Sequence, residues 1–350
     1  MAATVLAFDS LDLYNGIGTN TGLQARWNGL NWFYSPQMTA GRFAGSQALM
    51  NGNGEGCVSG LPITAAGPGY GLGLAFRMNN LSSVNATNTG PCVGICAASF
   101  AEQFGYRVRN DGSISIVRNG TVLGATAAGV ILNNTWHFIE IWGTLSTTVG
   151  TVNLKVDDVT VLTLTGLNNA QSGTTVFAGL AFGGQVFSSS GGFPPNNMSI
   201  DDIYFTDGAA SLGQRKIEVI RPNADTAQKD FVPDTGTVNF SRVNATLAQS
   251  TTYVQSGVLN AEDLYAMSDL VSSAASIDAV QLIAFAQKTD AATRKIALVA
   301  DVSAVVAQTA DLALGTSISI AEGIMLTAPG GAAWTQTSVN ALKVGPKVTV

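Results

Sequence analysis

Two pairs of neighbouring carboxylates are the residues best suited by type to acid–base chemistry: Asp157-Asp158 and Asp201-Asp202. Glycoside hydrolysis needs two carboxylates on either side of a cleft, about 5 Å or roughly 6.5–9.5 Å apart. Asp201 and Asp202 lie in a strand-like run, where neighbouring side chains point to opposite faces, so we do not expect both in one site. Asp157-Asp158 separates two alternating segments, a position where aspartate favours a turn. Neither pair predicts a catalytic site.

The single histidine and the three cysteines are candidates for metal or nucleophilic chemistry. Cys92 and Cys96 are close enough in sequence for a local disulfide, but with Cys57 and His137 they do not make the ligand spacing of a zinc site. His137 has no serine or cysteine at a nucleophile elbow as a partner. We therefore expect thiols made in a reducing cytoplasm, no zinc or other cofactor, no catalytic residue and no enzymatic activity.

Three further carboxylates are candidates for calcium: Asp9 and Asp12 near the first predicted strand, and Asp202 in the last strand of the same half. A calcium site needs several oxygen ligands that converge from different segments. The first and last strands of a sandwich often pair, which would bring these carboxylates to one rim. The alternative is that they are ordinary carboxylates at strand ends.

Four aromatic residues crowd into residues 27–34, flanked by asparagine and glycine. Sugars stack their C–H faces on such rings, and amide side chains can meet their hydroxyl groups. Aromatic side chains are also enriched where protein subunits meet. We expect Trp32, Phe33 and Tyr34 to be binding or interface residues, with subunit contact favoured over glycan, and Trp27 to belong to a core strand.

The elements that must position these residues are strands. Apolar and polar side chains alternate through residues 71–78, 113–118 and 136–164, with turn residues between the runs. Asn119-Gly120 predicts a tight hairpin, because both residues tolerate positive φ. Residues 136–164 predict a three-stranded meander. The pattern predicts an all-β fold whose sheets bury one face on a core.

Composition excludes several classes of function. Of the 350 residues, 46% are apolar but only 11% are charged, against about 25% in an ordinary soluble protein. No apolar run approaches the roughly 18 residues of a membrane helix, so we expect no membrane insertion. The net charge of −6 without a basic block argues against nucleic-acid binding. The first residues lack the charged start and apolar run of a secretory signal.

A change in charge density near residue 210 predicts two domains, 1–210 and 211–350. The first part holds 7 basic and 11 acidic residues, and the shorter second part holds 10 and 12. In the second part we expect a strand over 216–222, a short helix near 260–265, β segments at 277–287 and 294–301, and a final strand. Pro346 in that final strand indicates an edge or a bulge.

Three segments of the first domain together resemble the laminin-G-like, concanavalin A-like jelly roll. They are residues 40–49 (AGRFAGSQAL), the meander 136–164, and residues 200–205 (IDDIYF). In this family the first is an early strand, the second a central hairpin and the third the strand that closes the sandwich. The resemblance covers about residues 5–207 and implies an N-terminal jelly-roll sandwich followed by a smaller β-rich domain.

The whole chain resembles structural proteins of tailed-bacteriophage virions, in which this module is followed by a second domain. Segments 221–223, 252–254, 262–265, 279–281 and 345–348 carry the likeness of the second part. The resemblance implies a non-enzymatic tail, neck, collar or fibre component, made in the host bacterial cytoplasm and located in the virion. Its partners would be copies of itself and other virion proteins. The alternatives are a host-surface glycan-binding adhesin module and a head-decoration protein.

The low charge also predicts assembly. A protein surrounded by water usually spreads charged side chains over its surface and protects its edge strands with charge. This chain has few charges to spare for its edges. We therefore expect it to be one subunit of a symmetric or repeated assembly.

Overall fold

The computed structural model describes residues 3–14, 31–32, 37–50, 57–59, 67–84, 92–97, 102–171, 173–177, 179–182, 197–245 and 251–350. The chain divides into two compact units, Met1–Ile217 and Glu218–Val350. Both units are built almost entirely from antiparallel strands, which confirms the predicted all-β fold class.

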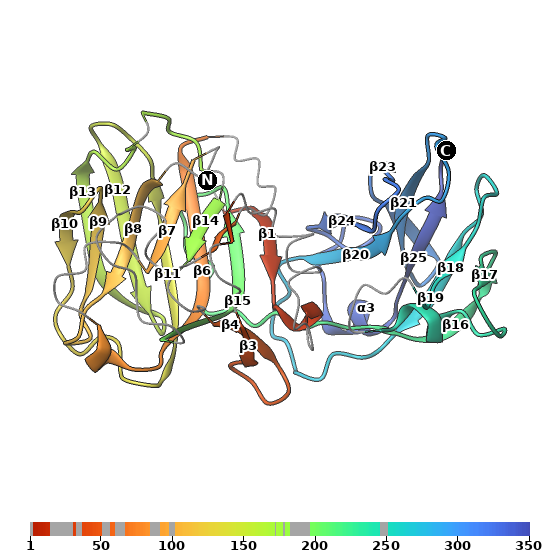
Figure 1. The fold of residues 1–350 in the computed structure, drawn as a ribbon, viewed down its shortest axis with the longest axis horizontal. Helices are drawn as coiled ribbons and strands as arrows, with labels where there is room; N and C mark the ends of the chain where they lie inside the picture. Colours follow the sequence, from red (N-terminus) through yellow and green to blue (C-terminus); the bar gives the residue numbers. More distant parts are fainter. Residues whose placement is uncertain are drawn as a thin grey trace. The chain divides into compact units, whose positions relative to one another are not determined.

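The N-terminal unit is a sandwich of two antiparallel sheets (Figure 1). The eight-stranded sheet contains, in spatial order, β13 (Val159–Leu167), β12 (Gly150–Val156), β11 (Trp136–Thr144), β6 (Gly69–Met78), β15 (Met198–Thr206), β4 (Gln47–Met50) and β3 (Gln37–Ala40), with β1 (Val5–Asp9) also paired to β15. The seven-stranded sheet contains β10 (Thr121–Ala125), β9 (Ile114–Arg118), β8 (Glu102–Val108), β7 (Val93–Cys96), β14 (Gly179–Phe182), β5 (Cys57–Ser59) and β2 (Asn31–Trp32). Two short 3-10 helices, η1 (Asp12–Tyr14) and η2 (Leu81–Ser83), lie between strands.

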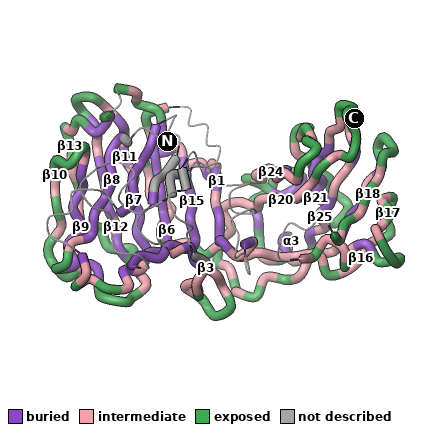
Figure 2. The backbone as a smooth tube through the Cα atoms, viewed as in Figure 1, coloured by how far each residue is buried: buried purple, intermediate pink, exposed green. Residues whose placement is uncertain are grey.

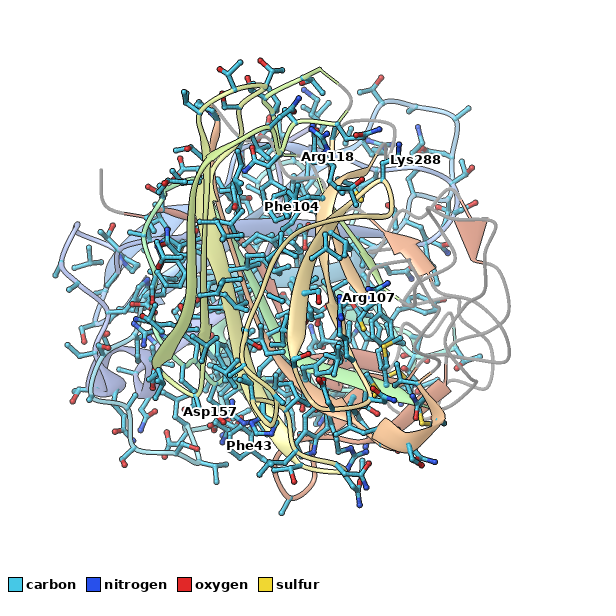
Figure 3. The ribbon with its side chains drawn as sticks, turned by 90° about the vertical axis from the view of Figure 1, so that its left-hand side faces the viewer. Phe43, Phe104, Arg107, Arg118, Asp157 and Lys288 are labelled. Carbon is cyan, nitrogen blue, oxygen red and sulfur yellow. The ribbon has the colours of Figure 1, made fainter. Side chains whose placement is uncertain are left out.

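The core of this unit fills the space between the two sheets. Tyr70 and Phe76 of β6 meet Phe104 and Tyr106 of β8 edge to face, with ring centroids 5.4 and 5.9 Å apart. All four rings are buried, and Phe104 lies among the packed side chains in Figure 3. Burial runs along the central strands, whereas β10 and β13 are largely exposed or half-buried (Figure 2). The sheets are therefore held together by aromatic and aliphatic burial.

The local hairpin predictions are confirmed. Strands β11, β12 and β13 form a meander, and β9 pairs with β10. The turns between them hold Asp157 and Asp158 at φ 49° and 65°, and Asn119 and Gly120 at φ 45° and 74°. Two consecutive residues of positive φ form the type of tight turn that matches the twist of paired strands.

The edge strand β13 is irregular. Its register with β12 shifts between the pairs Leu154–Leu162 and Lys155–Thr160, and again between Gly150–Leu167 and Val152–Leu164. Each shift places one extra residue on β13, which is a β-bulge. Gly166, in the second bulge, has φ 68°. β13 contains no charged residue, as the low charge of the chain predicts, and the two bulges interrupt the regular spacing of its backbone groups.

The first and last strands of the N-terminal unit pair, since β1 lies beside β15, as we expect of the terminal strands of a sandwich. The segment 40–49 is different from its expected form. It is the turn of a hairpin followed by a strand: β3 ends at Ala40, residues 41–46 form the turn, and β4 begins at Gln47.

The C-terminal unit has one larger sheet and two strand pairs. The larger sheet contains β16 (Pro222–Lys229), β19 (Asp263–Met267), β25 (Leu342–Val348), β21 (Lys295–Val302) and β22 (Val305–Gln308), with β23 (Leu312–Ala313) also on β21. The pairs are β20 (Val280–Ala286) with β24 (Ser319–Met325), and β17 (Val232–Pro233) with β18 (Val254–Gln255). Short helices α2 (Phe240–Val243) and α3 (Gln336–Asn340) complete it. Leu282, Leu298 and Trp334 are buried in its core.

Three expectations for this unit are wrong. The strand predicted over 216–222 begins at Pro222 instead, a position where the missing proline N–H breaks no ladder. The helix predicted near 260–265 is the start of β19. Pro346 lies in the central strand β25, opposite Leu298, and on its other side the β19 ladder is interrupted between Val344 and Lys347. That interruption accommodates a residue without an N–H.

Candidate functional site

The outer face of the eight-stranded sheet carries most of the polar chemistry of the N-terminal unit. Along β11, Ile139 and Ile141 point into the core, so Trp136, Phe138, Glu140 and Trp142 lie on the opposite face. The segment that follows β15 contacts this face, because Leu212 packs with Phe138 and Tyr204. This outer face is the candidate site, and its groups are considered in turn below.

Glu140 is the buried acid at the centre of this face, with 2% of its surface exposed. It accepts hydrogen bonds from the Tyr204 hydroxyl at 2.5 Å, the Ser211 hydroxyl at 2.9 Å and the Gly213 N–H at 2.8 Å. The Lys155 ammonium donates to Ser211 Oγ at 3.0 Å. Burial, followed by the charge of Glu140, raises the pKa of Tyr204 well above its usual range, so this hydroxyl remains a donor. Glu140 therefore holds the chain segment after β15 onto the sheet.

Asp201 and Asp202 point into one neighbourhood, so the expectation that they could not is wrong. The register of β15 on β6 shifts between Asp201 and Tyr204, and Asp202 has φ 48°. This bulge cancels the alternation of side chains. Arg42 meets both acids: its N–H donates to Asp201 Oδ2 at 2.7 Å, and its guanidinium lies 3.7 Å from Asp202 Oδ2.

Both acids of this pair are harder to ionise than an ordinary aspartate. Burial and then the neighbouring Asp202 raise the pKa of Asp201 to about 8. Burial raises the pKa of Asp202 to about 6, although the Ile217 N–H and the Arg42 charge act in the opposite direction. Two carboxyls in one desolvated site resist double ionisation because like charges repel. The pair is an acid–base constellation by type, and the chain donates hydrogen bonds to both of its members; Asp202 Oδ2 accepts none from the described residues and lies 3.7 Å from the Arg42 guanidinium.

Residues 211–217 are bound to the N-terminal unit. The Ile217 N–H donates to Asp202 Oδ1 at 2.8 Å, Arg42 donates to the carbonyl of Arg215 at 3.3 Å, and the Gln214 N–H donates to Asp158 at 3.0 Å. The compact units accordingly divide after Ile217, whereas the sequence places the start of the second domain at residue 211.

The calcium candidates make separate hydrogen bonds. Asp9 accepts from the Leu11 N–H at 2.7 Å and from the Tyr14 hydroxyl at 2.8 Å. Asp12 accepts from the Gln47 N–H at 2.6 Å, and its charge acts on Asp201 and Asp202. Within the described ranges, no group of three or more histidine, cysteine, aspartate or glutamate side chains is arranged to hold a metal ion.

His137 is part of the meander's own structure. Its Nε2 atom accepts from the Leu132 N–H at 3.0 Å, so the ring proton is on Nδ1, which donates to Asp157 Oδ2 at 2.6 Å. Asp157 also accepts from the Phe138 N–H at 2.8 Å. Both ring nitrogens are used, and the histidine holds the β12–β13 turn against the start of β11.

Cys92 and Cys96 are buried and are not joined in the disulfide that their spacing allows. Burial raises the pKa of the Cys92 thiol to about 12, and Cys92 Sγ accepts from the Val108 N–H at 3.2 Å. A thiol of such high pKa is a poor nucleophile.

The predicted aromatic site lies mostly outside the described residues. The backbone of Trp32 is in β2, paired with Cys57 in β5. Phe33, Tyr34 and Trp27 are not among the residues that the structure describes.

Sequence reasoning missed a second aromatic position, Trp142. In the register of the meander, Trp142 lies opposite Asn153, and Asn153 lies opposite Thr163. The Lys155 ammonium lies 5.4 Å from the centre of the Trp142 ring. The alternation in residues 136–142 contains this signal, because it places Trp136, Glu140 and Trp142 on one face.

Comparison with known proteins gives likeness of architecture only. Neither a protein-family model nor a curated protein matches the chain. Among solved structures, the alginate lyase Aly36B matches 61% of this chain and 100% of its own, at 10% identity and a TM-score of 0.41. The carbohydrate recognition domain of Emp46p, in its metal-free form, matches 59% of this chain and 100% of its own, at 11% identity and a TM-score of 0.34.

Two sialidase structures are also similar. The Ruminococcus gnavus IT-sialidase CBM40, bound to α2,3-sialyllactose, matches 47% of this chain and 91% of its own, at 11% identity and a TM-score of 0.34. Trypanosoma rangeli sialidase matches 47% of this chain at 14% identity and a TM-score of 0.34, and the match spans 26% of that enzyme's length. At these scores and identities, none of the four likenesses assigns a function to the chain. No helix in the described part of the chain has the length and hydropathy to cross a membrane.

Proposed function

We propose that the chain is a non-enzymatic structural component of a tailed-bacteriophage virion. The observation that carries this proposal is the use of its buried acids: among the described residues, each buried carboxylate accepts at least one hydrogen bond from the chain. These are Asp9, Glu140, Asp201, Asp202, Asp263 and Asp301. Acids bonded in this way stabilise a scaffold, which supports a structural role for the described residues over general acid–base catalysis.

The virion context of the proposal rests on the resemblance of both halves of the sequence. In this proposal the protein is made in the host bacterial cytoplasm and joins the tail, neck, collar or a fibre, with a place on the head as the alternative. Its partners are copies of itself and other virion proteins. The low charge of the chain, 11%, supports a surface partly covered by neighbours.

A virion reconstruction together with light scattering tests this proposal. We expect the chain to be located in purified particles and the isolated protein to form oligomers of defined mass. A stable monomer at high concentration that is also absent from purified virions would refute it. Assay of the protein against alginate, sialosides and neutral polysaccharides tests the enzymatic alternative, for which we expect no turnover.

A second candidate function is recognition of a glycan on the host surface. The observation that favours it is Trp142, a half-buried tryptophan on the outer face beside an asparagine, a lysine and two threonines. Binding of the purified protein to a glycan array tests this candidate, and retention of at least one oligosaccharide is the expected result.

A further inference from the structure

Five side chains of three neighbouring strands share one surface of the N-terminal unit, here called the Trp142 face. They are Trp142 of β11, Asn153 and Lys155 of β12, and Thr160 and Thr163 of β13. Register places Asn153 between Trp142 and Thr163, and Lys155 beside Thr160. Their strand neighbours Ile141, Leu154 and Leu162 belong to or pack on the core, so the five point outward.

Trp142 differs from the other tryptophan of the same strand face. Trp136 packs against the small apolar cluster of Ala75, Phe138 and Tyr204. Trp142 belongs neither to that cluster nor to the main core, and it is half-buried on a polar surface. Since a structural tryptophan gains its stability from apolar burial, Trp142 has no comparable role in the described core.

The ring of Trp142 is oriented before any ligand arrives. The Lys155 ammonium lies 5.4 Å from its centroid, within the range of a cation–π contact. Lys155 is itself held by its bond to Ser211, which donates to Glu140. A ring fixed in this way loses little conformational entropy when a ligand stacks on it.

Hydrogen-bonding groups surround the ring. Thr163 donates to Asn153 Oδ1 at 3.2 Å, and Asn153 Nδ2 has a long contact of 3.5 Å with the Trp142 carbonyl. An amide has two N–H donors and two acceptor lone pairs, so Asn153 keeps capacity for a ligand. Thr160 and Thr163 are exposed hydroxyls. An apolar ring with a few placed polar groups is the usual composition of a small-molecule site.

Charge decides the class of ligand. The one cation of the Trp142 face, Lys155, is linked through Ser211 to the carboxylate of Glu140. Asp157 and Asp158 form the turn that joins β12 to β13, at the border of the same face. The Arg215 guanidinium also lies near Asp158 and Tyr204. The three acids exceed these two cations by one charge, so a carboxylated or sulfated ligand would meet net repulsion. A neutral ligand rich in hydroxyl groups meets none.

We propose that the Trp142 face binds a neutral hexopyranose oligosaccharide, with one sugar ring stacked on Trp142 and its hydroxyls bonded to Asn153 and Lys155. Three strands span about 10 Å, which is room for a short oligosaccharide. This inference rests on the second candidate function, glycan recognition, and is independent of the virion assignment.

The test measures binding of the full-length protein to an array of neutral gluco-, galacto- and manno-configured oligosaccharides, with uronate and sulfated counterparts, followed by calorimetry on the best ligand. We expect a neutral oligosaccharide to bind with an affinity that Trp142→Ala lowers at least tenfold and Asn153→Ala lowers several-fold. Tyr253→Ala, which removes an exposed aromatic ring of the C-terminal unit, is the matched control and leaves binding unchanged. The melting temperatures of all three variants separate lost binding from lost folding, and Asn153→Ala keeps the test decisive if Trp142→Ala does not fold.

Three results would overturn the inference. Neutral-glycan binding that survives both substitutions would leave glycan recognition standing but place it elsewhere, for example in the aromatic run 27–34. Preference for uronate or sulfated sugars would contradict the class of ligand. No binding to any glycan would reject both the inference and the candidate function, and a change of oligomeric mass in Trp142→Ala would then assign the face to protein contact.

Discussion

Replacing Glu140 by alanine should destabilise the N-terminal unit and release residues 211–217 from the sheet. The substitution leaves Tyr204 Oη and Ser211 Oγ without their acceptor and leaves the Gly213 N–H with only its longer bond to Ser211 Oγ, at 3.1 Å. Tyr204 is only 4% exposed, so its unpaired hydroxyl bears the full cost of a buried donor, about 1–3 kcal/mol. The other two are half-buried and water can reach them in part, so we expect a total loss of about 3–4 kcal/mol.

Tyr204→Phe provides the internal check on this reasoning, since it removes one bond to a charged acceptor and leaves the other two. Its expected cost is about 1.5–2 kcal/mol. The double variant should cost less than the sum of the singles, because both remove the same bond.

The assay for these variants is urea unfolding of the full chain, followed by tryptophan fluorescence, with hydrogen exchange of residues 211–217 as the local readout. Ser211→Ala, which keeps Tyr204 paired, is the milder control and should accelerate exchange in the segment with a smaller loss of stability. A loss below about 1 kcal/mol in Glu140→Ala would refute the reasoning, because one unpaired buried hydroxyl alone should exceed it. Unchanged exchange in residues 211–217 would refute the assignment of Glu140 as the group that holds the segment.

Three other predictions concern ionisation, packing and thiol chemistry. Folding raises the pKa of Asp201 to about 8 and that of Asp202 to about 6, from an ordinary value of 3.8, so the folded state binds protons more tightly than the unfolded state. The contribution of the pair to stability should therefore fall as the pH rises from about 4 to about 8. Asp201→Asn should flatten this part of a curve of stability against pH. A Cβ at Gly345 would overlap the carbonyl oxygen of Asp263, so Gly345→Ala should destabilise the C-terminal unit by about 3 kcal/mol in calorimetry, while Gly315→Ala, whose Cβ has no neighbour closer than 3.8 Å, should not. In a Cys57→Ser variant, the buried Cys92 and Cys96 should react with a thiol reagent at pH 8 only as fast as the protein unfolds, and a rapid phase of labelling would contradict their burial.

The strands and tight turns of this fold could be predicted because their signals are local. Alternation over residues 136–164 predicts the meander, and the pair Asn119-Gly120 predicts a hairpin, because each pattern involves residues that are neighbours in sequence. The structure confirms both. The predicted pairing of the first and last strands of the sandwich also holds. Each of these depends on a pattern within a segment or on a general rule of sandwich folds.

The features that the sequence did not predict depend on contacts with residues that are distant in sequence. Asp201 and Asp202 share a neighbourhood because β15 bulges against β6, and nothing within residues 198–206 marks that bulge. Residues 211–217 resemble an interdomain joint in composition, yet Glu140, about 70 residues earlier, binds them to the sheet. Pro346 was expected at an edge or a bulge, but it lies in a central strand where one neighbouring ladder is interrupted. In each case the deciding contact is made by another strand.

The two bulges of β13 have a consequence for any particle that carries many copies of this chain. When many copies of an uncharged edge strand are held at high local concentration, sheets can add strands edge to edge and grow into fibrils. Such growth requires an unbroken row of outward N–H and C=O groups at regular spacing, and the extra residues of β13 disrupt that spacing twice within nine residues. In the proposed assembly, copies would therefore contact one another through side chains, while the sheet of each copy ends within its own chain.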